Sequence, residues 1–369
     1  MTKDGRPNFA VLGAGHGGQA MAAHLAMMGF RVALFNRTYH RIEPIIVRGG
    51  IELDGIIQGF GSPAIVTSNI GEAIADADVL MVAVPACAHE HIAELCAPHL
   101  RDGQVILLNP GRTGGALEFS RVIYERGVDA DVTIGEAQTF IYASRSMGPA
   151  QSKIFRIKNS VPIAALPASR TPLLMEAVRE AFPQFVPAVN VLKTSLDNMG
   201  AVFHPAITLM NVGWIEARMG EFEFYLEGVT PSVAKVLEGV DAERVAVARA
   251  IGVEDVVTSL EWLEIAYAAT GDNLYEAMHN NEGYGGIKAP ATMRNRYLFE
   301  DIPASLVPIA SLGKMLGVPT PTLDSLIHLG CLIHGIDYWT TGRTVKHLGL
   351  EGLTVKEIQQ LVMKGRGGL

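Results

Sequence analysis

The sequence has few cysteines, few charges and no long apolar segment. Only three of its 369 residues are cysteines (Cys87, Cys96 and Cys331), which excludes a disulfide framework and predicts a reducing, cytoplasmic environment. The longest apolar run, Val79–Ala88, is too short to cross a bilayer, and Met1–Pro7 contains no apolar signal core. We therefore expect no membrane association.

The charge balance is acidic rather than basic. The formal net charge is −8 and the calculated pI is about 5.8. A general nucleic-acid binder needs a basic field, so no nucleic-acid partner is expected. Hydrophobic residues make up 49% of the chain and charged residues 18%, which allows large buried cores and argues against long disordered stretches. A chain of this length is expected to form two domains.

The first half of the chain alternates apolar strands with helical patterns. Strands that are apolar on both faces and separated by helices predict a doubly wound parallel sheet of the Rossmann type. A strand pair, Ile154–Ile157 and Pro162–Leu166, is expected to extend this sheet. The predicted strands of the sheet itself are Phe9–Gly13, Val32–Phe35, Val79–Val84, Val105–Leu108 and Val132–Ile134.

The second half reads as helical throughout, with few strand signals. We predict a dinucleotide-binding domain over residues 1–185 and an all-α substrate domain over residues 186–369. The apolar character of these helices favours a homodimer. The predicted helices are Ala206–Arg218, Pro231–Ile251, Val256–Tyr267, Leu306–Leu316, Leu323–His334 and Val355–Met363.

The most informative motif is a glycine-rich turn after the first predicted strand. It matches G-x-G-x-x-G and consists of Gly13, Ala14, Gly15, His16, Gly17 and Gly18. The first glycine permits a tight turn, the second lets the backbone approach a pyrophosphate, and the third allows close packing of helix on sheet. The helix start then offers free N–H groups to the phosphates. The alternative is a tight strand-to-helix turn without a ligand.

The end of the second predicted strand indicates which dinucleotide is bound. Enzymes that use NAD usually carry an acidic residue there, whereas this chain has Asn36, Arg37 and Thr38, with Arg41 soon after. Arg37 can pair with a 2′-phosphate, and Asn36 and Thr38 can donate hydrogen bonds to it. NADP is favoured, NAD remains possible, and Arg37 could also be a solvated loop residue.

Two further strand ends are expected to face the cofactor, because ligands of such sheets bind outside the carboxyl ends of the strands. These ends carry Val84 with Pro85, and Asn109, Pro110 and Gly111, and Thr113 begins the helix that follows. The cluster Cys87-Ala88-His89-Glu90-His91 resembles a metal site, but it starts a predicted helix and no second ligand pair follows at suitable spacing. No metal is expected.

Uncommon strings in both halves resemble the octopine/nopaline (opine) dehydrogenase family. They occur in the expected order over nearly the whole chain. They include Leu107-Leu108-Asn109-Pro110-Gly111, Thr113-Gly114-Gly115-Ala116-Leu117-Glu118-Phe119, His204-Pro205, Tyr225-Leu226-Glu227-Gly228, Thr230-Pro231-Ser232-Val233, Asp241-Ala242-Glu243-Arg244 and Arg296-Tyr297 with Phe299-Glu300-Asp301.

The resemblance implies an active site between a Rossmann domain and a helical domain. It implies NAD(P)H-dependent joining of the amine of an amino acid to the carbonyl of a 2-oxo acid. It assigns catalysis to His204, Asp301 and Arg296, with Asn198 nearby. A histidine suits proton transfer near neutral pH, an aspartate can fix its tautomer, and an arginine can clamp a carboxylate or support the aspartate.

Two residues depart from the family pattern and leave alternatives open. A family relative has an acidic residue where this chain has Asn36 and a small residue where it has Arg112. Arg112 is expected to contact NADP, to contact a second carboxylate, or to be exposed. A hydroxy-acid or ketopantoate-type NADP-dependent reductase would use a lysine with a downstream asparagine, which Lys193 and Asn198 imitate with a different spacing. A non-catalytic NADP-binding sensor is the third possibility. The identities of the oxo acid and the amine are not determined by the sequence.

Overall fold

The computed structural model describes residues 5–365, and their contacts divide the chain into two compact units. The nucleotide unit contains the described residues up to 111, those from 115 to 194 and those from 360 onward. The helical unit contains residues 112–114 and 195–359. The domain boundary at residues 185/186 stays a prediction, because contacts alone do not test which segments fold independently.

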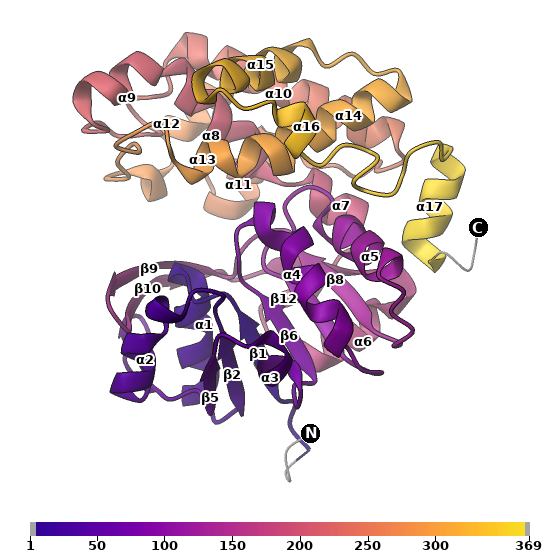
Figure 1. Ribbon diagram of the computed structural model, residues 1–369. Helices are drawn as coiled ribbons and strands as arrows, with labels where there is room; N and C mark the ends of the chain where they lie inside the picture. The colour runs from indigo at the N-terminus through magenta and orange to yellow at the C-terminus, as the bar shows by residue number, and fades with distance from the viewer. Residues whose placement is uncertain (1–4, 366–369) are drawn as a thin grey trace. The chain divides into compact units, whose positions relative to one another are not determined.

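An eight-stranded sheet lies at the centre of the nucleotide unit (Figure 1). Its order is β12-β11-β8-β7-β6-β1-β2-β5, in which β5, β2, β1, β6, β7 and β8 are parallel and β11 is antiparallel to β8. The chain builds outward from β1 and then returns past it to β6, which is the order reversal of a Rossmann fold. The predicted fold class is confirmed. The strands are β1 Phe9–Leu12, β2 Val32–Phe35, β5 Ile65–Thr67, β6 Val79–Val82, β7 Val105–Leu108, β8 Thr133–Ala137, β11 Val161–Leu166 and β12 Phe185–Pro187.

The central strands are apolar on both faces because helices cover both. Every residue of β1, β2, β6 and β7 is buried. Helices α1 and α6 share one hydrophobic core on one face, and α3, α4 and α5 lie on the other, in front of the sheet in Figure 1. The helix bounds are α1 His16–Met27, α3 Ile70–Ile74, α4 His89–Cys96, α5 Gly115–Glu125 and α6 Thr171–Val178, and a short α2, Glu43–Arg48, follows β2.

A separate four-stranded sheet corrects one sequence prediction. Its order is β4-β3-β10-β9, and β10 contains the segment Ile154–Ile157 that was expected to extend the main sheet. Only the second member of that predicted pair does so, as β11. Partly exposed, glycine-containing strands give weak alternation signals, which is why this sheet was missed. Its strands are β3 Ile51–Gly55, β4 Gly59–Gly61, β9 Tyr142–Gly148 and β10 Gln151–Ile157.

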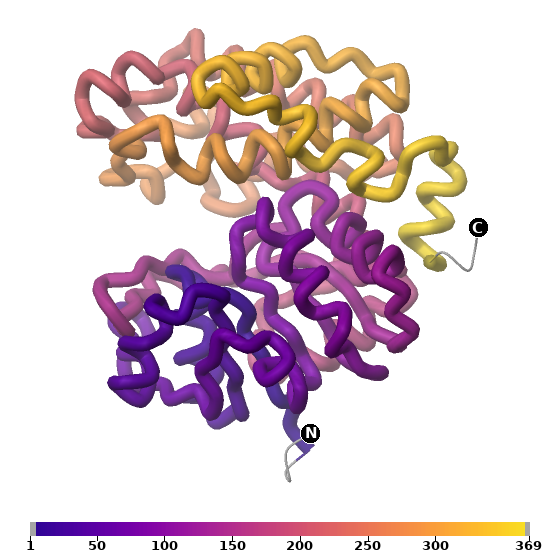
Figure 2. The backbone as a smooth tube through the Cα atoms, viewed as in Figure 1, coloured from indigo at the N-terminus to yellow at the C-terminus, as the bar shows by residue number. Residues whose placement is uncertain are grey.

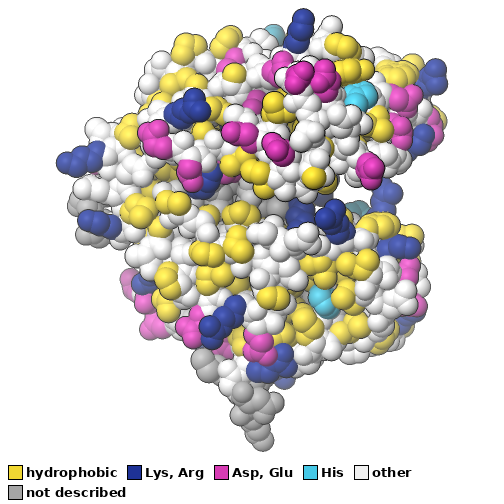
Figure 3. Space-filling view, turned by 180° about the vertical axis from the view of Figure 1, so that it is seen from behind, with side chains coloured by type: hydrophobic (Ala, Val, Ile, Leu, Met, Phe, Trp, Pro, Cys, Tyr) yellow, Lys and Arg dark blue, Asp and Glu magenta, His cyan; other side chains and the backbone are white. Residues whose placement is uncertain are grey.

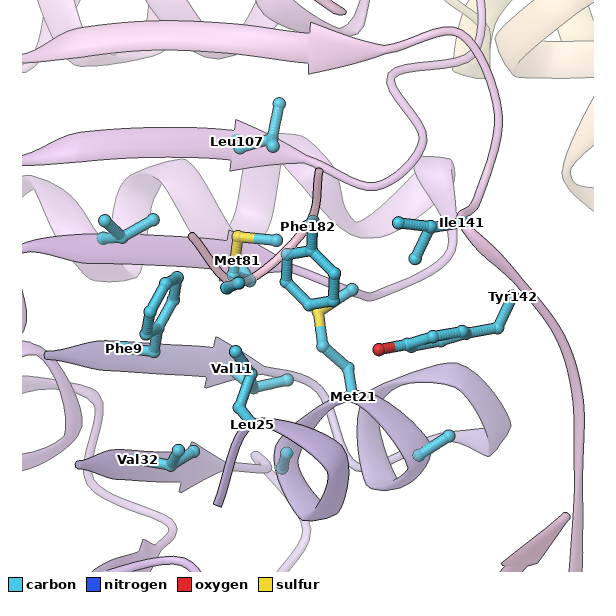
Figure 4. Packing of buried hydrophobic residues seen from close by; sticks show 14 of the residues in the cluster. Phe9, Val11, Met21, Leu25, Val32, Met81, Leu107, Ile141, Tyr142 and Phe182 are labelled. Carbon is cyan, nitrogen blue, oxygen red and sulfur yellow. The ribbon is translucent and has the colours of Figure 1, made fainter. Parts of the chain in front are cut away.

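Helix α1 is packed on opposite sides by the two sheets. It contacts β1 and β2 of the main sheet and all four strands of the smaller one. Figure 4 shows Met21 and Leu25 of this helix beside Phe9 and Val11, with Tyr142 approaching Met21 from the smaller sheet. The helix that begins at the glycine turn is therefore fixed by core packing rather than by a single amphipathic face.

The second unit is built from helices, traced from rose through orange to yellow in Figure 2. The long helix α10, Pro231–Ala250, packs against four others and is the centre of the unit. Thr230 caps its first turn by accepting a hydrogen bond from the Val233 N–H, and Pro231 occupies the first helical position, where no donor is needed. The other helices are α8 Met199–Met210, α9 Val212–Arg218, α11 Ser259–Tyr267, α12 Leu274–His279, α13 Arg296–Phe299, α14 Val307–Leu316, α15 Pro321–His334 and α16 Tyr338–Thr341.

Two helices contribute residues to both units. Helix α7, Val191–Leu196, begins in the nucleotide unit, and α17, Val355–Lys364, begins in the helical unit. Helix α17 matches the predicted segment Val355–Met363 to within one residue. On the face drawn in Figure 3, acidic, basic and apolar side chains are interspersed. Among residues 5–365, no helix combines the length and the apolar character needed to cross a bilayer.

Candidate active site

The glycine turn has the backbone geometry that its motif predicts. Gly13 follows β1 with φ +115°, a conformation that side chains disfavour, and a Cβ there would lie 2.7 Å from a Val84 methyl carbon. A Cβ on Gly18 would collide with the carbonyl of Gly13, so helix and turn can approach closely only with glycine. A Cβ on Gly15 would meet nothing within 4 Å. The turn is tight on the protein side and open on its outer side.

The start of α1 suits an anion. Gly15 is its N-cap, no side chain caps the first turn, and no acidic residue occupies that turn. The uncapped N–H groups and the positive end of the helix dipole both favour phosphate. The imidazole of His16 is held by a hydrogen bond, in which its Nδ1 accepts from the Ser146 N–H at 2.9 Å.

Asn36 has a role that the sequence did not show. Its Oδ1 accepts a hydrogen bond from the Ala14 N–H at 3.1 Å, and its Nδ2 donates to the Thr38 carbonyl at 3.0 Å. Both ends of the amide therefore hold the two loops at the carboxyl ends of β1 and β2. Nδ2 carries a second hydrogen, which is the one that could serve the expected hydrogen bond from Asn36 to a 2′-phosphate.

Basic side chains follow Asn36 in the same loop. Arg37 and Arg41 are exposed, and for their side chains no hydrogen bond or ion pair with residues 5–365 is recorded; the Arg41 backbone N–H donates to the Thr38 carbonyl at 3.1 Å. Thr38 is the N-cap of the 3₁₀ turn Tyr39–Arg41, and its side chain makes no capping bond. Residues 36–42 contain no carboxylate. The loop is therefore electrostatically suited to an additional phosphate.

The other two strand ends lie where the sequence predicts. Val84 and Pro85 follow β6 and are partly or fully exposed, and Asn109 follows β7 with its side chain buried. The Asn109 Nδ2 donates to the Leu107 carbonyl at 3.0 Å, while its Oδ1 has no hydrogen-bond partner among the described residues. A buried polar atom without a partner at the carboxyl end of a parallel strand is a position for a ligand donor.

Thr113 differs from this set. Its hydroxyl donates to the Ser195 carbonyl at 3.2 Å, its N–H donates to the Ala304 carbonyl, and its own carbonyl accepts from Arg343. These contacts place Thr113 in the helical unit, with its side chain 1% exposed. These bonds therefore hold Thr113 to other segments of the helical unit. They give no support to its predicted contact with a cofactor.

The helical unit places a histidine on a buried aspartate. His204 lies in α8 and is 19% exposed at its side chain, and its Nδ1 is 2.8 Å from Asp301 Oδ2. Asp301 is fully buried. This contact fixes the ring so that Nε2 is the nitrogen left for proton exchange, as in other histidine–carboxylate pairs.

A charge network surrounds this pair and corrects one expectation. Arg296 pairs with Glu300 at 2.9 Å rather than supporting Asp301, and its own side chain is 62% exposed. Arg112 instead contacts both carboxylates, with Nε 3.2 Å from Glu300 Oε1 and Nη1 3.2 Å from Asp301 Oδ1. Burial alone would lower the pKa of Arg112. The carboxylates of Asp301 and Glu300 outweigh this effect, so the pKa of Arg112 is raised.

A π-helical turn follows Asp301. It spans Ile302–Leu306 and carries Ser305, whose hydroxyl accepts a hydrogen bond from Asn198 Nδ2 at 2.9 Å. Asn198 is 3% exposed and is the N-cap of α8, the helix that carries His204. Single π turns recur at functional sites because they displace side chains from regular helical positions. Here the turn joins the Asp301 segment to the base of α8.

An aromatic side chain stacks on the imidazole, and further rings pack behind it. The ring of His204 stacks on Tyr297, with centroids 4.3 Å apart and an interplanar angle of 22°. Tyr297 continues through Phe224 to Tyr225, whose pKa is raised well above its usual value by burial and by neighbouring tyrosines and Asp301. Tyr225 therefore stays neutral, and the site is apolar on one side of the imidazole and ionic on the other.

The side chains of Cys87–His91, the segment that resembles a metal site in the sequence, differ in their burial. His89 begins α4 and is fully buried, whereas Cys87 is exposed in the preceding turn. Among residues 5–365, no group of three or more His, Cys, Asp or Glu side chains lies close enough together to hold a metal ion. The segment does start a helix, as the sequence predicts.

Comparison with known proteins decides the family. Residues 187–334 match the model described as the NAD/NADP octopine/nopaline dehydrogenase, alpha-helical domain, and residues 8–109 match the NAD binding domain of 6-phosphogluconate dehydrogenase. An opine dehydrogenase of Arthrobacter sp. (strain 1C) is 41% identical over 355 residues, 96% of this chain and 98% of that one. The chain belongs to the opine dehydrogenase family.

Solved structures share the fold of this opine dehydrogenase family member. An octopine dehydrogenase with NADH and L-arginine superposes with a TM-score of 0.77 at 22% identity, covering 97% of this chain and 98% of that chain. A yersinopine dehydrogenase with NADP⁺ gives 0.76 at 15% identity, covering 98% of each chain. The family acts as NAD(P)-dependent oxidoreductases on CH–NH groups, and the chain is an enzyme of this type.

The sequence analysis gave two site residues no role and left a third with alternatives. Glu300 pairs with Arg296 at i,i+4 along a helix, so the spacing alone could have indicated it. Tyr297 was named only as part of a string that resembles the family. Arg112 was expected to contact NADP, to contact a second carboxylate or to be exposed, and the last of these is wrong because its side chain is 10% exposed. Arg112 is separated from Asp301 by nearly two hundred residues, and no local pattern predicts that contact.

Proposed function

We propose that the chain condenses a 2-oxo acid with the amine of an amino acid and reduces the product with NADPH, with His204 exchanging the protons. The buried His204–Asp301 pair carries this proposal, because both condensation and reduction need a group that gives and takes protons near neutral pH. The C–N bond forms as the carbonyl oxygen leaves as water. The bound dinucleotide supplies the hydride to the resulting carbon.

In this scheme, Asp301 orients the imidazole and stabilises its charged form. His204 protonates the departing oxygen, and in the reverse direction it takes a proton from the amine or from water. The neutral, buried Tyr225 and the stacked Tyr297 limit water around the imidazole.

Arg296 and Asn198 are assigned to substrate recognition. The guanidinium of Arg296 is largely exposed while it pairs with Glu300, so it can offer its remaining N–H groups to a substrate carboxylate. Asn198 donates to Ser305, and its carbonyl oxygen is the group left for an amine or a cofactor amide.

The phosphates are assigned to the glycine turn and the nicotinamide side to the other strand ends. The open space at Gly15, the uncapped start of α1 and the partnerless Oδ1 of Asn109 fit such a ligand. NADP preference rests on Arg37, with Arg41 and Thr38 in support. One related structure contains NADP⁺ and another contains NADH, so the family accommodates both.

The cofactor assignment is tested by Arg37→Ala. The dissociation constant for NADPH is expected to rise about 10- to 100-fold, the loss of a charge-assisted pair worth about 1.5–3 kcal/mol. The NADH constant should change less than about threefold. Arg31→Ala is the matched control, since Arg31 is an exposed arginine before β2 that pairs with Asp76. Equal weakening of both cofactors would contradict the assignment.

The catalytic assignment is tested by a matrix of 2-oxo acids against amino acids with NADPH, read by its absorbance. NADPH oxidation is expected only when both substrates are present, and His204→Gln should lower it at least about 100-fold. Turnover with an oxo acid alone would indicate a hydroxy-acid or ketopantoate-type reductase. Tight NADPH binding without turnover in any combination would indicate a sensor.

A homodimer in the cytoplasm is proposed as the working state. The apolar helices support the dimer. The three free cysteines support a reducing compartment such as the cytoplasm. Light scattering of the purified chain at micromolar concentration should give twice the monomer mass of 39.6 kDa. A monomer mass at all concentrations would contradict the dimer.

A further inference from the structure

Arg112 holds an unfavourable backbone conformation. Its φ of 58° is left-handed, a region that favours glycine. The next two residues are fastened, since the Thr113 N–H donates to the Ala304 carbonyl at 3.1 Å and the Gly114 N–H donates to Ser195 Oγ at 2.9 Å. Such strain persists where the surroundings fix it, and it is concentrated at functional positions. A glycine would fit this backbone without strain, so the arginine side chain requires its own explanation.

The side chain explains the cost by reaching two buried carboxylates. Its Nε contacts Glu300, its Nη1 contacts Asp301, and its own exposure is 10%, against 2% and 0% for the two acids. A Cβ on Gly200 in α8 would collide with Nη1, so the absence of a side chain there leaves room for the guanidinium. The planar fork of arginine can serve two carboxylates at once, which a lysine cannot do in the same geometry.

The carboxylate of Asp301 thereby lies between the guanidinium of Arg112 and the imidazole of His204. Oδ1 faces Arg112 and Oδ2 faces Nδ1 of His204. An ideal Cβ on Gly200 would lie 2.4 Å from Arg112 Nη1 and 3.4 Å from His204 Nδ1, so these two nitrogens are within about 6 Å of each other, where two positive charges repel. The titratable or charged groups in contact around the pair are Arg112, Glu300, Arg296, Tyr225 and Tyr297.

We propose that Arg112 is a positioning residue that acts through Asp301: it holds Oδ2 against His204 and sets the pH at which the imidazole exchanges its proton. The proposal rests on the function proposed for His204 and Asp301. Without the guanidinium, the full charge of Asp301 acts on the imidazole and the opposing positive charge is gone. The protonated ring then gains stability, and the ring releases its proton only at higher pH.

The test is an NMR titration of the histidine rings in the intact protein, with the His204 signal assigned by its loss in His204→Gln. In Arg112→Met, the titration midpoint of His204 is expected to move up by about 1 to 2 pH units, from an effective dielectric constant of about 20 and a separation of about 6 Å. Arg112→Lys should recover part of this shift. Arg296→Met is the matched control, because Arg296 contacts Glu300 but not Asp301, and its shift should stay below about 0.3 units.

An unchanged midpoint in Arg112→Met, or an equal shift in Arg296→Met, overturns the proposal. The titration needs no substrate, so it decides the role of Arg112 even if no pair of substrates is turned over. Arg112→Gly distinguishes the effect of the strained backbone from the effect of the guanidinium. It should unfold at a temperature no lower than Arg112→Met because its backbone is unstrained. It should show the same upward shift of His204.

When a substrate pair is found, the same variants give a second readout. The limb of kcat/KM for the oxidative direction, which needs a neutral imidazole, should move to higher pH in Arg112→Met by the amount measured in the titration. A lower rate with an unmoved limb would indicate that Arg112 binds substrate, which overturns a positioning role.

Discussion

Replacing the buried carboxylate of Asp301 by an amide tests the centre of the proposed mechanism. Asp301→Asn keeps the shape of the side chain and removes its charge, at a position with no solvent exposure. The charge-assisted bond between Oδ2 and His204, 2.8 Å long, is then lost. A hydrogen bond to a charged partner contributes about 1.5–3 kcal/mol, and the orientation of the imidazole is lost with it.

The loss falls on the step in which the imidazole carries a positive charge, so it lowers kcat more than it raises KM. At about 1.4 kcal/mol per factor of ten, and with tautomer disorder added, we expect kcat to fall about 10²- to 10⁴-fold. The pH limb assigned to His204 should move to lower pH, because an amide does not stabilise the charged ring. That direction is opposite to the one expected for Arg112→Met.

The assay is steady-state and single-turnover NADPH oxidation across pH, with thermal unfolding measured in parallel. Asp241→Asn is the matched control. Asp241 is a buried carboxylate of the same unit that accepts hydrogen bonds from Arg244 at 2.6 and 3.0 Å, away from His204. It should lower the melting temperature through a broken buried pair, without moving the pH limb. An Asp301→Asn enzyme within tenfold of wild type, with an unshifted limb, would refute the reasoning.

Three further outcomes are expected. Gly18→Ala should abolish tight NADPH binding and lower the melting temperature, because the added Cβ collides with the Gly13 carbonyl; calorimetry showing normal binding would contradict the proposed turn. Burial lowers the pKa of His24, so the folded state resists its protonation and stability falls as pH drops below about 6.5; His24→Gln should flatten this acid-side loss in thermal melts, and an unchanged slope would exclude His24 as its source. Burial raises the pKa of Cys96 to about 12, so an alkylating reagent at pH 8 should label the exposed Cys87 and spare Cys96 in peptide mass spectra, and equal labelling would be incompatible with the fold.

The parts of the fold that repeat a strong local signal could be predicted from the sequence. The strands Val32–Phe35 and Val105–Leu108 have the predicted bounds, because four consecutive apolar residues between turn signals leave little choice. The glycine motif was predictable for a related reason, since Gly13 and Gly18 each answer a separate steric demand. The predicted helix Ala206–Arg218 begins too late: α8 begins at Met199 and continues through Pro205, a residue type that usually interrupts a helix.

What escaped prediction depends on contacts between distant segments. The smaller sheet pairs β3 with β10, nearly a hundred residues later, and no local pattern reports such a register. The partners of Arg112 are equally distant, whereas the pairing of Arg296 with Glu300 was available from helical spacing and was overlooked. Of the predicted catalytic residues, His204 and Asp301 are in direct contact. Arg296 pairs with Glu300, the residue before Asp301, and Asn198 donates to Ser305 in the turn after it.

The amide of Asn36 has a consequence for redesigning cofactor choice. An aspartate at this position, the usual change toward NAD, could still accept from the Ala14 N–H. It has no hydrogen to give the Thr38 carbonyl, and would set two oxygens with negative character side by side. The bond between the two loops would remain, but the second loop would lose its internal bond from residue 36 to Thr38, so an enzyme changed at this position would need a compensating substitution near Thr38. Any redesign at position 36 therefore has to treat the cofactor contact and the shape of the loop together.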